Sequence, residues 1–186
     1  MIPVTQTKVG IRNSAGELIQ NGNCWAAAIA SLLEIPISEV PNFEVWFNTD
    51  VCYIWYDLTQ CFLIQRGHTL EYDNRFKVFH HTEDEWNTVG DDWYDKYAQM
   101  GEYHKLREEL KDQYYLVSGP SPRGVSHATI WQNGVMVHDP HPTREGILEL
   151  KTFEVIRPLI EEEKQISKDY KNNYHVALPS IKQKVA

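Results

Sequence analysis

The sequence predicts an α+β protein in which helices come first along the chain and an antiparallel sheet comes second. Three observations support this class. The stretch CWAAAIASLLE (24–34) is rich in helix formers. Several runs after residue 113 are rich in β-branched and aromatic residues and are separated by turn residues. Asn133-Gly134, between two of these runs, is a strong hairpin signal. The 186 residues are enough for one hydrophobic core, so we expect a single domain over residues 1–186.

The first half of the chain supplies the predicted helices. Residues 1–10 are expected to form a short strand, and NSAGEL (13–18) a turn. The helix at 24–34 is stopped by Pro36. A second, buried helix is expected over about 45–66, where an apolar stripe is closed by Gly67.

The second half of the chain supplies most of the sheet. HTLEYD (68–73) alternates like a strand. Residues 74–112 are acidic and aromatic, and we interpret them as an insert made of a loop and an amphipathic helix. The tail from 161 to 186 is expected to be a helix followed by a strand at YHVALP. The strands of the main sheet are expected at 114–119, 125–131, 135–139 and 146–160.

Composition excludes several classes of protein. A net charge of -8 and a pI near 5.4 argue against a general nucleic-acid or anionic-membrane binder. No signal sequence or membrane-spanning apolar run is apparent. The cysteines at 24, 52 and 61 are odd in number, and no CxxC pair indicates structural zinc. We therefore expect free thiols in a reducing, cytoplasm-like compartment, with Cys52 and Cys61 as buried structural thiols.

The stretch SHATIWQNGVMVHDPHP is the most informative part of the sequence. A two-residue loop of Asn133-Gly134 would set His127 opposite Pro140. A three-residue loop that includes Gln132 would instead set His127 opposite Asp139. Directly opposed side chains share a face of the sheet and lie about 5 Å apart at Cβ. We predict the three-residue loop, because it lets the carboxylate orient the imidazole.

Cys24, at the predicted start of a helix, is the partner that this histidine needs. A helix N-terminus lowers a thiol pKa through its dipole and free N–H groups, and a nearby imidazole favours the thiolate further. Each residue alone has an ordinary structural interpretation: a buried small hydrophobe, a satisfied polar strand residue, a strand exit. Their combination predicts a Cys24, His127, Asp139 nucleophilic site.

The order of these residues resembles that of the papain-like cysteine peptidase superfamily. The similarity is strongest to compact prokaryotic and phage members, such as the leader-processing peptidases of bacteriocin exporters. These place Cys at the start of a buried helix, His on a strand after a long gap, and Asp, often as Asp-Pro, after the next strand. NCW resembles the Cys-Trp of papain-like enzymes, and the similarity covers roughly residues 20–67 and 114–150.

The resemblance implies a cysteine hydrolase that cleaves a peptide or isopeptide bond through a thioester, without a cofactor. Its partner would be a peptide or protein substrate in the cytoplasm, that of the host cell if the protein is phage-encoded. The Cys24 backbone N–H would be one oxyanion donor. The second would be Gln20, which lies four residues before Cys24 where the family usually has Gln six before, or else Asn21 or Asn23. Trp25 and Arg123 are the remaining candidates for substrate binding.

Three alternatives stay open. The chain could be a catalytically inert papain-like scaffold that binds or inhibits a protein through the aromatic residues of 74–112. It could be a related acyltransferase or amidase. His138, Asp139 and His141 could bind a metal, although His138 and Asp139 point to opposite faces of a strand and no zinc motif surrounds them. We therefore predict no metal.

Overall fold

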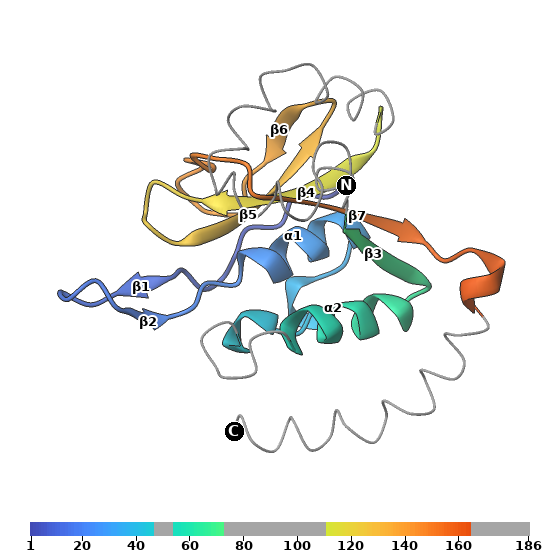
Figure 1. Cartoon of the computed structure of the whole chain (residues 1–186), viewed down its shortest axis with the longest axis horizontal. Coiled ribbons are helices and arrows are strands. Elements are labelled where there is room, and N and C mark those ends of the chain that lie inside the picture. Colours follow the sequence, from blue (N-terminus) through green and yellow to red (C-terminus); the bar gives the residue numbers. More distant parts are fainter. Residues whose placement is uncertain (47–53, 73–110, 165–186) are drawn as a thin grey trace, which may run out of the picture. The chain divides into compact units, whose positions relative to one another are not determined.

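The computed structural model describes residues 1–46, 54–72 and 111–164 (Figure 1). The described residues fall into two units. One lies within Met1–Glu44 and Tyr72–Val155, the other within Val45–Glu71 and Ile156–Ala186. Most of the predicted insert at 74–112, Cys52 and the predicted C-terminal strand lie outside the described residues. The α+β class is confirmed, because a five-stranded sheet accompanies a small number of helices.

Helix α1 (Cys24–Leu33) is the predicted first helix and is almost entirely buried. Its alanines leave no bulky side chain between the helix and strand β5, against which it packs. Glu34 ends the helix in a left-handed conformation, with its N–H bonded to the carbonyls of the last turn. A short 3₁₀ helix, η1 (Ile37–Glu39), then begins directly after Pro36.

The predicted strand over residues 1–10 is wrong. The N-terminal hairpin instead joins β1 (Ile11–Arg12) to β2 (Leu18–Gln20), around the predicted turn at 13–18. Residues 1–8 form a strap along α1: the backbone N–H groups of Ile2 and Val4 donate to Ser31 near its end, and residues 7 and 8 lie at its start. The backbone N–H groups of Thr7 and Lys8 both donate to Asn23 Oδ1, at 3.0 and 2.8 Å.

The main sheet has the strand order β3-β7-β4-β5-β6. The pairs β4–β5, β4–β7 and β5–β6 are antiparallel. The strands confirm the predicted runs, except that the one predicted at 146–160 is shorter. The bounds are β3 (His68–Tyr72), β4 (Tyr114–Pro120), β5 (Ser126–Gln132), β6 (Val135–His138) and β7 (Thr152–Pro158).

The segment before β7 crosses β4 at Gly119, which explains the shorter strand. Leu148 N–H donates to Pro120 O at 2.7 Å, and Lys151 N–H donates to Ser118 O at 2.8 Å. A Cβ at Gly119 would lie only 1.8 Å from the carbonyl oxygen of Glu149. Only glycine permits this approach, and Gly119 is paired directly with His127 of β5.

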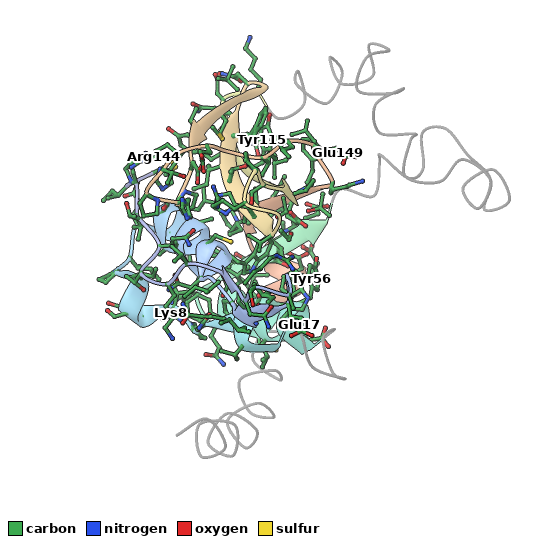
Figure 2. The ribbon with its side chains drawn as sticks, turned by 90° about the vertical axis from the view of Figure 1, so that its left-hand side faces the viewer. Lys8, Glu17, Tyr56, Tyr115, Arg144 and Glu149 are labelled. Atoms are coloured by element: carbon green, nitrogen blue, oxygen red, sulfur yellow. The ribbon has the colours of Figure 1, made fainter. Side chains whose placement is uncertain are left out.

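The sheet face that carries His127 also carries a hydrophobic cluster. Tyr115, labelled in Figure 2, stacks on Phe153 with ring centroids 5.9 Å apart. Trp131 packs against this cluster and donates its indole N–H to Thr129 Oγ1 at 2.8 Å. The cluster is completed by Val117, Val155, Ile147 and Leu150. His127 and Thr129 therefore stand in a row that the core holds in place.

The other unit contains α2 (Ile54–Ile64) and β3. The predicted second helix over 45–66 is thus shorter than expected, and the 3₁₀ helix η2 (Phe43–Trp46) precedes it. Gln60 joins helix to strand, because its side chain accepts the N–H and donates to the carbonyl of Leu70. None of the described helices has the length and apolar character needed to cross a membrane.

Candidate active site

The hairpin between β5 and β6 has a two-residue loop, so the predicted three-residue loop is wrong. Asn133 and Gly134 both have positive φ, 51° and 78°, as a type I′ turn requires. Gln132 pairs with Val135 as a consequence. This tight turn matches the right-handed twist of the flanking strands, which a three-residue loop achieves only with a bulge of its own.

A β-bulge in β6 brings Asp139 to the sheet face that carries His127, which the two-residue loop alone would not do. Trp131 pairs with Met136 but Ile130 pairs with His138, so one residue of β6 is extra. Continued by one pair, this register sets Asp139 opposite Thr129, on the same face as His127 two residues away. The carboxylate is therefore a diagonal neighbour of the imidazole, not the directly opposed residue that was expected.

The predicted hydrogen bond between His127 and Asp139 is present. His127 Nε2 lies 2.6 Å from Asp139 Oδ1, and both side chains are buried. Asp139 also accepts the backbone N–H groups of His141 through Oδ1 and Gly146 through Oδ2, each at 2.7 Å. Burial alone would raise the pKa of Asp139, but these three hydrogen bonds outweigh it and lower the pKa to about 2.

The ionised carboxylate determines the tautomer of His127. A carboxylate without a proton only accepts hydrogen bonds, so Nε2 must carry the proton. In the neutral imidazole, Nδ1 is then unprotonated and can act as a base. The hydrogen bond to Asp139 also stabilises the imidazolium that forms when Nδ1 takes a proton.

Cys24 is the first residue of α1 and lies against β5. The backbone N–H of Ala128, the neighbour of His127, acts on the Cys24 thiol and favours its ionised form. The thiol is nevertheless not activated in this structure. Burial, followed by the charge of Glu44, raises the pKa of Cys24 from 9.0 to about 12. Within the described residues Cys24 and His127 make no hydrogen bond to each other.

The predicted lowering of the Cys24 pKa is therefore wrong for this conformation. The N–H groups at the start of α1 do act in the predicted direction, but desolvation of the buried thiol is the larger effect. Only 8% of Cys24 is exposed. Exposure of a side chain depends on the tertiary packing and was not visible in the helix pattern.

The side chains predicted as oxyanion donors are engaged elsewhere. Gln20 is exposed and donates from Nε2 to Val9 O at 2.9 Å. Asn23 is buried, and its Nδ2 donates to Thr7 Oγ1 at 2.9 Å while its Oδ1 accepts two backbone N–H groups of the N-terminal strap. Asn21 donates from Nδ2 to the carbonyl oxygen of Glu44 at 2.7 Å. These residues shape the entrance to α1 and leave the Cys24 backbone N–H as the remaining predicted donor.

Trp25 and Arg123, the predicted substrate-binding residues, lie in different environments. Trp25 is 2% exposed and belongs to the core, because the residue after the helix start points inward. Arg123 pairs with Glu145 at 3.2 Å, and its Nη2 is buried without a hydrogen bond in the described structure. Its charge acts on His141, whose pKa is lowered by burial, by Arg123 and by His127. The rings of His141 and His127 are 6.0 Å apart, so Arg123 belongs to the surroundings of the site.

The histidines considered as metal ligands have other partners. His138 Nε2 lies 2.9 Å from Val4 O, and His141 Nδ1 lies 2.8 Å from Thr143 Oγ1. Across residues 1–46, 54–72 and 111–164, no three His, Cys, Asp or Glu side chains are grouped as a metal ion would require.

Two residues that sequence reasoning missed lie at the site. Gln6 is buried, bonded through its backbone N–H to Pro140 O at 2.9 Å, and its amide adjoins Gly22, two residues before Cys24. Glu44 is buried at the start of α1. Neither has a local motif; only the contacts made across the chain identify them.

No family model matches the chain, and no curated protein or solved structure shows significant similarity to it. A proposal of function for this protein therefore depends on the arrangement of its residues.

Proposed function

We propose that the protein is a cysteine hydrolase that cleaves a peptide or isopeptide bond with Cys24, His127 and Asp139. The observation that carries the proposal is the buried His127–Asp139 hydrogen bond of 2.6 Å. It lies next to the Ala128 backbone that contacts the Cys24 thiol. The order of these residues, similar to that of papain-like peptidases, supports the same chemistry. The substrate is a peptide or protein in the cytoplasm, that of the host cell if the protein is phage-encoded.

The proposed reaction has two steps. Cys24 Sγ attacks the carbonyl carbon while His127 Nδ1 takes the thiol proton, and the oxyanion accepts the Cys24 backbone N–H. The imidazolium then protonates the leaving amine as the C–N bond breaks, which leaves a thioester. In the second step the oxygen of a water molecule attacks the thioester while His127 takes a proton from that water. The carboxylic acid is released, and the proton returns to Cys24 Sγ.

The raised pKa of Cys24 determines how the first step occurs. A thiol with a pKa of about 12 does not form a resting thiolate–imidazolium pair. His127 acts instead as a general base during the attack, when substrate brings sulfur and Nδ1 together.

A catalytically inert scaffold that binds a protein is the second candidate. Two observations favour it: the raised pKa of Cys24 and the lack of a hydrogen bond between Cys24 and His127 in the described residues. An acyltransferase or amidase would share the first step with the hydrolase; in an acyltransferase an amine would replace water in the second.

Acyl transfer from p-nitrophenyl acetate separates these candidates. We expect a burst of p-nitrophenol and an acetyl group on Cys24, detected by mass spectrometry, in the wild type. Cys24→Ala and His127→Ala should abolish both. Cys61→Ala is the matched control, because Cys61 is also a buried cysteine outside any disulfide, and it should leave the burst unchanged. Acetylation of Cys24 at equal rates in wild type and His127→Ala, or none in the wild type, would rule out the hydrolase.

A further inference from the structure

A carboxylate from outside the helix caps α1. Glu44 Oε1 accepts the backbone N–H of Trp25 at 2.7 Å and that of Ala26 at 3.2 Å. Asn23, at the N-cap position, makes no side-chain capping hydrogen bond. Glu44 therefore satisfies first-turn donors that a local cap would normally satisfy. The N–H of Cys24 is not among the groups bonded to Glu44, so the proposed oxyanion donor stays separate.

Among the described residues, the second oxygen of this carboxylate has no hydrogen-bond partner. Glu44 is 1% exposed, and its Oε2 is buried without a hydrogen bond in the described structure. Asn21 fixes the backbone of Glu44 through its carbonyl, so the side chain is held in this position. A buried carboxylate that lacks partners for one oxygen is costly to ionise. Burial accordingly raises the pKa of Glu44 to about 7, although its hydrogen bonds to backbone N–H groups oppose the rise.

The negative charge of Glu44 acts electrostatically on the Cys24 thiol. The charge of Glu44 is, after burial, the second cause of the raised pKa of Cys24. Lys8 of the N-terminal strap, labelled in Figure 2, is the charged group that lowers the pKa of Glu44. The described groups that lower the pKa of Glu44 are the backbone N–H groups of Glu44 itself, Ala26 and Trp25, followed by the charge of Lys8. Two neighbouring buried groups of like charge do not readily ionise together.

We propose that Glu44 is a positioning residue that holds the first turn of α1 and, by its negative charge, keeps the Cys24 thiol protonated. Cys24 is then easier to ionise when Glu44 carries a proton than when Glu44 is ionised. This inference rests on the proposed function only in taking Cys24 as the reactive group.

The test is the rate of iodoacetamide alkylation of Cys24 from pH 6 to 10, read by mass spectrometry. Glu44→Gln keeps an oxygen for the N–H groups of Trp25 and Ala26 but removes the charge. We expect its Cys24 to react about tenfold faster than wild type at pH 8, because each unit of pKa lowered raises the thiolate fraction about tenfold. Glu44→Asp, which keeps the charge, should remain slow.

Glu154→Gln is the matched control. Glu154 is another buried carboxylate whose Oε2 has no hydrogen bond to the described residues and whose pKa is raised by burial to about 7, but it is not among the groups that act on Cys24. Its variant should alkylate at the wild-type rate. Hydrogen exchange of the α1 amides reports whether the helix survives in each variant.

Two results would overturn the inference. One is a Glu44→Gln protein with protected α1 amides whose Cys24 reacts no faster than wild type. The other is faster reaction accompanied by loss of α1 protection, which would make Glu44 a structural cap only. Neither result requires a substrate or His127, so the proposed function is tested separately by acetylation.

Discussion

At the scale of single residues, the effects that lower and raise the pKa of Cys24 can be compared as free energies. A helix N-terminus contributes about 0.3–2 kcal/mol in favour of a negative group. The rise of the Cys24 pKa from 9.0 to about 12 corresponds to about 4 kcal/mol against the thiolate. Burial and the charge of Glu44 therefore outweigh the helix. The Cys24 thiol is held in its neutral form.

The same scale predicts the effect of Asp139→Asn. The amide can present an N–H to Nε2, which would favour the tautomer with the proton on Nδ1 and remove the base. It also removes the charge that stabilises the imidazolium. We expect acetylation of Cys24 to slow by about 10²-fold or more, measured by the burst with p-nitrophenyl acetate. Asp112→Asn, on an exposed turn, is the control and should react normally. A normal burst in Asp139→Asn would contradict a role for this pair.

Glu44 predicts how stability depends on pH. Its folded pKa of about 7 lies above its ordinary value of 4.5, so the folded state binds the proton more tightly. The resulting stability is fully present below pH 4.5 and is lost as pH rises through 7. Glu44→Gln should remove a loss of about 3 kcal/mol in the free energy of unfolding over this interval, measured by urea unfolding. An equally steep loss in the variant would show that Glu44 ionises freely in the folded protein.

At the scale of elements, the crossing at Gly119 positions the strand that faces His127. Gly119→Ala would force Cβ against the Glu149 carbonyl and break the hydrogen bonds on either side of it. We expect a loss of about 3 kcal/mol of stability by urea unfolding, from overpacking and unmet buried hydrogen bonds. Gly10→Ala is the control, because its Cβ would have ordinary contacts of 3.6 Å or more. Equal stability of the two variants would contradict the close approach.

At the scale of the whole molecule, the first residues of the chain tie the parts of the site together. Gln6 N–H donates to Pro140 O, directly after Asp139, while Asn23, directly before Cys24, binds Thr7 and Lys8. The strap thus contacts both the start of the helix that carries Cys24 and the strand end that carries Asp139. Residues 1–10 were expected to form a strand, and residues 6–8 instead connect Asn23 with Pro140, more than a hundred residues further along the chain.

The strap predicts a structural role for Asn23. Asn23→Ala leaves the N–H groups of Thr7 and Lys8 without their acceptor, so we expect a loss of about 2–3 kcal/mol in the free energy of unfolding. Gln20→Ala, which removes an exposed side chain, should leave both stability and the acetylation burst unchanged. Normal stability in Asn23→Ala would contradict its structural role. Loss of the burst in Gln20→Ala would instead assign Gln20 the role of an oxyanion donor.

The sequence by itself determined the α+β class, the helix that begins at Cys24, and the pairing of His127 with Asp139. These features depend on helix propensity, strand alternation and turn residues, which act between near neighbours along the chain. The exact loop was not predictable, because a two-residue turn followed by a bulge brings Asp139 to the same face as the three-residue loop would.

Only the tertiary structure decided whether Cys24 is exposed, which side chains surround it, and what Glu44 does. Glu44 lies outside the helix that it caps, and nothing in its local pattern marks it as a cap. Burial and charge act through space, so the pKa of a thiol depends on every group packed around it. For this protein the order of residues identifies the groups of the site, and packing determines their state of protonation.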